Sequence, residues 1–227
     1  MKTMNFRTVL FFIMILSVKP LFSQGNYLCI GFNNNGLCFG SPKNFNGLKF
    51  GFFDRNVNDV NGCNIAIGCF TKKTNGVSLG LIAVNASRLN GLAIAGSGIG
   101  IESKFNGLGV SGLRIYADTL NGLFISLFGI TEGRKGRYLI KEMNGLAIGG
   151  IVGVNCKTFN GVVLGILNKS INQNGLSFGL RNYTENLHGI QIGLWNIATN
   201  KKYFRKLPFI NFCFKKNIQN QSSNIQN

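Results

Sequence analysis

The sequence predicts an all-β repeat protein, most simply a parallel β-solenoid of about 10–11 coils with a C-terminal cap. Three observations support this fold class. A short motif returns along almost the whole chain, apolar residues alternate with a variable residue after each motif, and a small residue always follows them. One copy of such a motif cannot bury an apolar face alone, whereas a stack of copies forms a continuous core.

The motif is an Asn-Gly pair, as in "NGLAIGGIVGVN" at residues 144–155. Most copies follow one another after 14 to 16 residues, with one step of 11 after Gly36 and one of 23 after Gly122. Ten copies carry Asn before the glycine, and the last carries His188. The eleven motif glycines are Gly36, Gly47, Gly62, Gly76, Gly91, Gly107, Gly122, Gly145, Gly161, Gly175 and Gly189.

Apolar residues occupy the positions one and three places after every motif glycine, such as Leu92 and Ile94, and the position between them varies. Alternation with a period of two is typical of a strand with one buried face, so we expect these two columns to be buried. The position four places after the glycine is always small, which indicates a close approach of another backbone. Asn and Gly both tolerate the positive φ of a tight corner, and stacked Asn side chains can hydrogen-bond from coil to coil.

Two architectures fit this repeat. In a solenoid each copy is one coil, whereas in an up-and-down outer-membrane β-barrel each copy is one strand and Asn-Gly closes a hairpin. A barrel strand keeps its apolar residues in phase, because a slip of one residue moves them to the other face. The residue before Asn is usually apolar, but it stays in phase with the apolar columns in only five of ten steps. This pattern favours the solenoid and leaves the barrel as the alternative.

The chain divides into four regions. Residues 1–24 form the expected signal peptide, with Lys2 and Arg7 before an apolar run at residues 9–18 that is too short to span a bilayer. The β-repeat domain is expected at residues 25–200, with an insertion near residues 131–143. A capping strand at residues 201–216 and a disordered tail at residues 217–227 follow. The signal predicts export to the periplasm, the outer membrane or the cell surface.

The chain carries 24 Lys and Arg residues against seven acids, a formal net charge of +17. This balance favours an anionic partner such as an envelope polysaccharide, although solubility explains it equally well. Another surface protein is a second candidate partner, membrane association stays open, and we expect no nucleic acid. The insertion "TEGRKGRYLIKEM" supplies the candidate binding residues, and a tolerated loop is the alternative interpretation: Arg134, Lys135, Arg137 and Lys141.

No catalytic constellation is visible in the sequence. The seven acids form no recognisable pair and His188 is the only histidine, so we expect no enzyme, no cofactor and no metal site. Six exported cysteines allow 15 pairings, and the sequence permits one disulfide near the N-terminal end without determining the pairing. Cys63 lies in an apolar column, where we expect a small buried hydrophobic residue.

The segments "NGVVLGILN", "NGLSFGLRN" and "HGIQIGLWN" resemble the unit of an exported surface-repeat family of spirochaetes and Bacteroidota-type bacteria. Members of that family commonly show Gly-apolar-Gln-Ile-Gly-Leu-apolar-Asn in series, and "RKLPFINF" is similar to the end of their arrays. The resemblance covers nearly all of residues 26–214. It implies an exported, non-enzymatic surface or envelope protein and supplies no site residues.

Overall fold

The computed structural model describes residues 27–32, 35–54, 56–131 and 140–214. The expected signal peptide, the expected C-terminal tail and residues 132–139 of the insertion lie outside this part. The described residues contain thirteen strands and no helix, so no helix that could span a membrane occurs among them. The strands are β1 (Tyr27–Phe32), β2 (Asn35–Gly40), β3 (Asn44–Phe53), β4 (Val57–Ala95), β5 (Gly98–Ser111), β6 (Arg114–Tyr116), β7 (Thr119–Ser126), β8 (Gly129–Ile130), β9 (Ile140–Gly149), β10 (Gly153–Gly165), β11 (Leu167–Phe178), β12 (Arg181–Ala198) and β13 (Lys206–Cys213).

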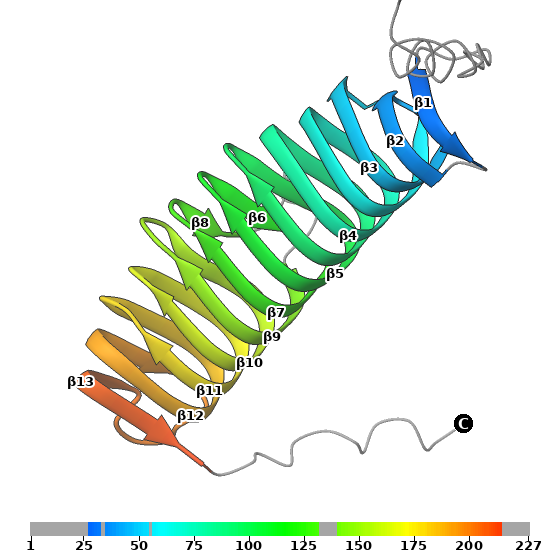
Figure 1. Ribbon diagram of the computed structural model, residues 1–227. Coiled ribbons are helices and arrows are strands. Elements are labelled where there is room, and N and C mark those ends of the chain that lie inside the picture. Colours follow the sequence, from blue (N-terminus) through cyan, green and yellow to red (C-terminus); the bar gives the residue numbers. More distant parts are fainter. Residues whose placement is uncertain (1–26, 33–34, 55, 132–139, 215–227) are drawn as a thin grey trace, which may run out of the picture.

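The strands form coils that stack along one nearly straight axis (Figure 1). Neighbouring coils from β2 to β12 pair in parallel, and their Asn-Gly motifs are in register. Gly107 of β5, for example, lies opposite Gly122 of β7. An up-and-down barrel needs antiparallel neighbours. The solenoid prediction is therefore confirmed, and the barrel alternative is wrong.

Both ends of the stack carry a strand of reversed direction. At the N-terminal end, β1 pairs antiparallel with β2, and the disulfide between Cys29 and Cys38 joins them. At the C-terminal end, β13 pairs antiparallel with β12. The expected C-terminal cap is thus present as β13, and the disulfide that the sequence permits near the N-terminal end joins Cys29 to Cys38.

The two residues of the motif have separate roles. Every motif glycine has a positive φ, between 122° and 148°, and a Cβ on Gly107 would overlap the carbonyl oxygen of Gly91 in the preceding coil. The motif asparagines do not share this conformation. They form the expected ladder instead, in which each Nδ2 donates to the Oδ1 one coil earlier at 2.6 to 2.9 Å, from Asn46 to Asn174.

The expected buried face is wrong, because the two apolar columns point outward. Ile94 is 42% exposed and Phe39 is 46% exposed. The interior is filled from the residue before Asn, such as Phe105, and from the variable position two places after the glycine, such as Phe124. Cys63, expected to be buried, is half-buried on the outer side.

The narrow interior explains this reversal. Phe105 and Phe124 pack at 4.9 Å between ring centroids, and a Cβ on Gly109 would lie only 2.7 Å from the Phe105 ring. Large residues before Asn therefore leave room for mostly small ones two places after the glycine, and the columns of Leu, Ile, Val and Phe must lie outside. The small fourth position does mark a close backbone approach, since a Cβ on Gly179 would overlap the carbonyl oxygen of Gly165.

Replacing a motif glycine should disrupt the stack. We expect Gly107→Ala to lower the free energy of unfolding by about 3 kcal/mol or more, because the Cβ meets backbone and the positive φ is strained. Gly98→Ala is the matched control on β5, since its Cβ would lie 3.3 Å from the Arg114 carbonyl oxygen without a positive φ. It should cost less than about 1 kcal/mol. Urea denaturation followed by circular dichroism measures both, and equal losses would refute this role of the motif glycine.

Candidate functional site

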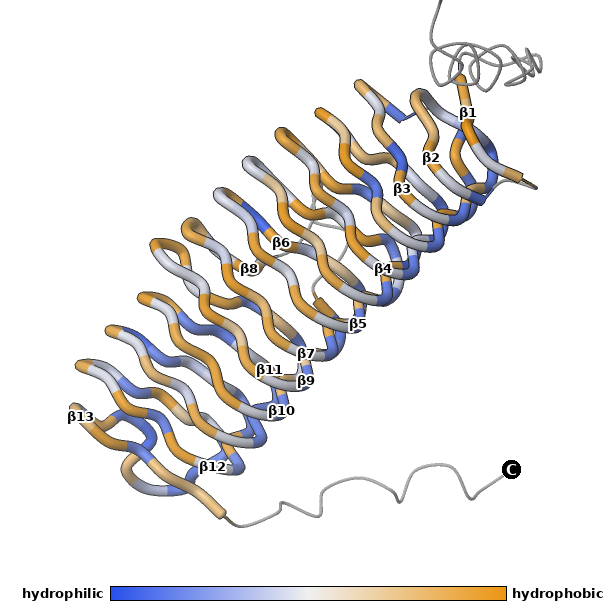
Figure 2. Tube along the Cα trace, in the orientation of Figure 1, coloured by the Kyte–Doolittle hydropathy of each residue, from blue (hydrophilic) through white to orange (hydrophobic). Residues whose placement is uncertain are grey.

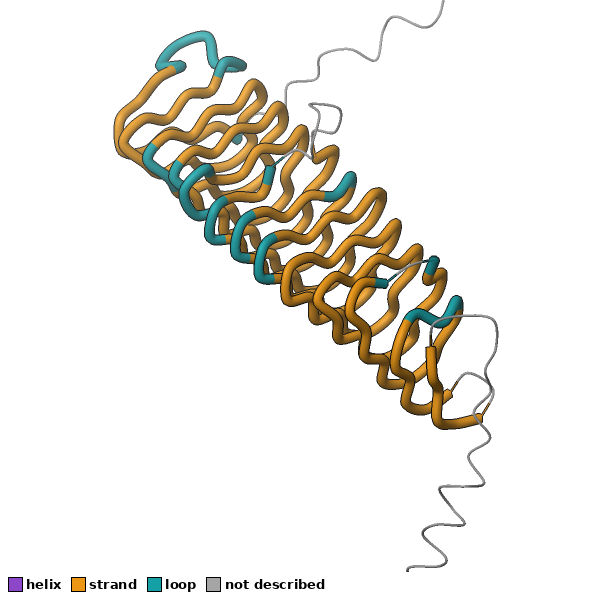
Figure 3. The backbone as a smooth tube through the Cα atoms, turned by 90° about the horizontal axis from the view of Figure 1, so that it is seen from above, coloured by secondary structure: helices purple, strands orange, loops and turns teal. Residues whose placement is uncertain are grey.

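Each coil has two sides joined at the Asn-Gly corner. We call the residues that follow the motif glycine the motif side, and the residues that lead to the next Asn the return side. A row of short loops lies along one long edge of the stack (Figure 3), and hydrophilic residues gather along the asparagine edge (Figure 2). Outward residues of the return side include many charged ones, among them the exposed Lys72, Lys157 and Lys169.

A row of cations crosses the return side near the middle of the stack. Lys73, Arg88 and Lys104 each lie three places before a motif glycine in successive coils, and Arg88 pairs in register with Lys104. Neighbouring strands are about 4.8 Å apart, so the backbone places these three side chains at that interval. All three are exposed.

The row lines a shallow groove of about 550 Å³, which we call the basic groove. Its remaining lining residues are polar, and two of them belong to the asparagine ladder. The lining consists of Lys73, Arg88, Asn90, Ser103, Lys104, Asn106, Asp118, Thr119 and Lys141. No aromatic residue is among them.

Among the described residues, one carboxylate lines the groove, and it is already paired. Asp118 forms an ion pair with Lys141, with 2.7 Å between Oδ2 and Nζ. Within the described ranges, Lys73, Arg88 and Lys104 form no ion pair. The groove therefore presents three cations that form no ion pair with a described residue, beside amide and hydroxyl groups that can hydrogen-bond a ligand.

The structure places one of the four predicted binding residues in this groove. Lys141 lies on β9, while Arg134, Lys135 and Arg137 lie outside the described residues. Lys73, Arg88 and Lys104 contribute most of the groove's charge and were not predicted from the sequence. Their shared offset from the motif glycine was the available signal, but it becomes a row only when the coils are stacked in register.

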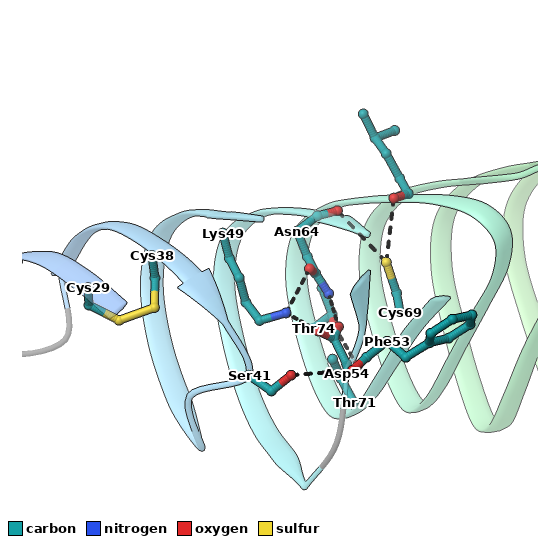
Figure 4. Close-up of polar contacts among 11 residues, drawn as sticks. Cys29, Cys38, Ser41, Lys49, Phe53, Asp54, Asn64, Cys69, Thr71 and Thr74 are labelled. Carbon is teal, nitrogen blue, oxygen red and sulfur yellow. Dashed lines mark hydrogen bonds and ion pairs between the residues drawn. A yellow bond between two sulfur atoms is a disulfide. The ribbon is translucent and has the colours of Figure 1, made fainter. Parts of the chain in front are cut away.

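A second polar cluster is enclosed in the stack (Figure 4). Lys49 of β3 forms an ion pair with Asp54, and both side chains are fully buried. Lys49 also donates to Asn64 at 3.1 Å, and Asn64 donates to Asp54 at 2.8 Å. Because water and ligands cannot reach these groups, the cluster joins two coils and is not a binding site.

The buried thiols are likewise unsuited to chemistry. Burial raises the pKa of Cys69 to about 12, with a further contribution from Asp54, and burial raises the pKa of Cys156 to about 12. A thiol must ionise to act as a nucleophile or a metal ligand. Among the described residues, no group of three His, Cys, Asp or Glu side chains could hold a metal ion.

Comparison with known proteins gives no relative: no protein-family model matches the chain, and no curated protein or solved structure matches it significantly. The resemblance to the exported surface-repeat family therefore stays a prediction.

The buried ion pair should matter far more to stability than the exposed one. We expect Asp54→Asn to lower the free energy of unfolding by about 3 to 5 kcal/mol, because it leaves the Lys49 charge buried without a counter-charge. Asp118→Asn is the matched control, since it breaks an ion pair whose side chains are 65% and 21% exposed and should cost less than about 1 kcal/mol. Urea denaturation measures both losses, and a small loss for Asp54→Asn would contradict the structural role.

The two buried thiols should resist alkylation while the chain is folded. At pH 8, well below a pKa of about 12, almost no thiolate forms at Cys69 or Cys156. Iodoacetamide followed by mass spectrometry should therefore find both unmodified, and unfolding in urea should make both react. The half-buried Cys63 and Cys213 serve as internal references. Equal rates at Cys69 in folded and unfolded protein would be inconsistent with its burial.

Proposed function

We propose that the protein is an exported, non-enzymatic scaffold of the cell envelope that binds a linear anionic polysaccharide along the basic groove. The observation that carries this proposal is the row of Lys73, Arg88 and Lys104 in three consecutive coils. A linear polymer with charges along its length can contact such a row at several points, and several weak contacts add up to useful affinity.

The rest of the groove supports a carbohydrate over a nucleic acid. Asn90, Asn106 and Ser103 offer amide and hydroxyl groups suited to sugar hydroxyls. Proteins that bind single-stranded nucleic acid usually stack bases on aromatic side chains, and none of the described lining residues is aromatic.

The non-enzymatic assignment rests on where the reactive groups lie. Asp54 is buried in an ion pair, Asp118 is paired with Lys141, and the most deeply buried thiols have raised pKa values. The other described carboxylates are exposed and do not line the basic groove: Asp59, Glu102, Glu142 and Glu185. A general acid or nucleophile needs access to its substrate and a pKa near the working pH. Export is inferred from the signal-like residues 1–24 and agrees with the disulfide, because disulfides persist in oxidising compartments.

Neutralising the row should weaken binding to an acidic polysaccharide. The test is isothermal titration of the purified protein with polygalacturonate at low and at physiological salt. We expect the triple variant Lys73→Gln, Arg88→Gln and Lys104→Gln to bind roughly tenfold more weakly or worse, and the wild-type affinity to fall as salt screens the charges.

A matched control removes the same number of positive charges from another part of the return side. Lys157→Gln, Lys169→Gln and Arg181→Gln remove three exposed return-side cations that do not line the groove. Their combined effect should be much smaller than that of the groove variant. If both triple variants lose the same affinity, binding follows net charge alone and the groove is not the site. If the wild type does not bind the polymer, the proposed function is wrong.

A further inference from the structure

The motif side of the solenoid has an outer surface made of apolar residues throughout. We call this surface the apolar face. It consists of the residues one and three places after each of the eleven motif glycines, together with the outward residues of β1 and β13 that continue the same two columns. All of them are Leu, Ile, Val or Phe except Cys63. At the loop edge, Leu81 and Leu127 extend the face and are 74% and 72% exposed.

The end strands show that the apolar face is not a by-product of the repeat. Neither β1 nor β13 carries the Asn-Gly motif, and both run antiparallel to their neighbours. Even so, Leu28 and Ile30 of β1 pair with Phe39 and Leu37, and all four are apolar. At the other end, Phe212 and Ile210 of β13 pair with Ile190 and Ile192. The outward columns are therefore apolar wherever a strand lies, whatever its direction.

The inward positions between these columns are less apolar than the outward ones. Five of these inward positions hold polar or charged side chains that are fully or almost fully buried: Lys49, Asn64, Ser78, Ser177 and Gln191. A sheet that faces water usually shows the opposite distribution, with polar residues outside. Large contiguous exposed apolar patches on soluble proteins mark interaction sites. The apolar face thus has the composition of a surface that is covered in the working protein.

We infer that the occupant of this face is the apolar face of a second copy of the chain. The eleven motif segments together with β1 and β13 give thirteen strand segments across the face. At about 4.8 Å apart they extend over roughly 60 Å, and five residues of strand give a width of roughly 15 Å. Stacking two such faces buries on the order of 1,800 Å² in total. Stable protein–protein interfaces bury about 1,200 to 2,000 Å², so the area suffices for a stable dimer.

Two further properties suit a second copy. The ridges of the face repeat at the strand spacing, so an identical surface has the same period and its side chains can interdigitate along the whole length. The exposed cations of the return sides, such as Lys157 and Lys169, are placed on opposite outer surfaces by a face-to-face dimer. Those surfaces are roughly 30 Å apart for sheets about 10 Å apart, beyond the screening length of about 8 Å at physiological salt. Dimerisation therefore keeps the return-side cations of the two copies apart. Lys201, in the turn before β13, is an exception at one end, where its Nζ lies 5.9 Å from the centre of the Phe212 ring.

A lipid surface fits the same face less well. If the apolar face lay in a membrane, the cations of the return side would point into water, on the far side of the solenoid from the headgroups. Attraction to anionic lipid acts only near the membrane surface and falls off within a screening length. The high positive charge would then contribute little to membrane binding. In the dimer, by contrast, the return-side cations are too far apart to oppose association.

Sedimentation velocity of the purified wild-type protein, over a wide range of concentrations, is the primary test. We expect a species with twice the mass of the chain that dissociates on dilution. The double variant Leu92→Glu and Leu108→Glu should lower the association constant by roughly tenfold or more. Lys157→Glu is the control, because it changes the net charge by the same two units on the return side and should leave association intact. Thermal melts by circular dichroism establish that each variant is folded.

Two measurements keep the test independent of those substitutions. In a Cys213→Ser variant, a maleimide probe should modify Cys63 more slowly as the protein concentration rises, because Cys63 lies in the apolar face. Wild-type protein should also stay unbound when it is floated with phosphatidylcholine and phosphatidylglycerol vesicles. A monomer at every concentration, or a monomer that floats with either vesicle, would overturn the inference. Neither result would bear on binding of polysaccharide to the basic groove.

Discussion

The close approach of the backbone at each motif glycine is the constraint on which the rest of the structure depends. Each glycine has a positive φ and leaves no room for a Cβ beneath the preceding coil. This fixes the corner of every coil at one residue and aligns all coils in register. The asparagine ladder, the interior layers and the outer columns follow from that alignment, because any residue at a given offset from the glycine meets its equivalents above and below.

The sequence was sufficient to predict the architecture but not the side on which each column lies. The length of the repeat and the phase of its apolar residues distinguished a stack of coils from a barrel, because both can be counted directly along the sequence. The apolar columns were assigned to the interior by the general rule that apolar residues are buried. That rule failed because Phe105 and its equivalents already fill a narrow interior. Available volume, which the sequence does not display, decided the outcome at Ile94 and Cys63.

The candidate site shows a similar division. The sequence pointed to the insertion near residues 131–143, of which the described residues place only Lys141 at the basic groove. Lys73, Arg88 and Lys104 are separated by about one coil of sequence, and each alone is an ordinary surface cation. Their significance arises from register, which brings distant residues into one row. In a stacked protein, function-bearing clusters are therefore to be sought down a column of the repeat and not along a stretch of the chain.

The reversed strands at the two ends determine how long this object can be. A parallel stack presents the same open edge at each end as it does inside, so another coil could always be added, as in a growing fibril. Here β1 and β13 each turn an antiparallel edge outward, and the disulfide between Cys29 and Cys38 holds the first of them in place. On the motif side of either end, a coil from another molecule would therefore meet a strand of reversed direction in place of the parallel edge found inside the stack. The two reversed strands therefore oppose end-to-end growth of the stack into a fibre.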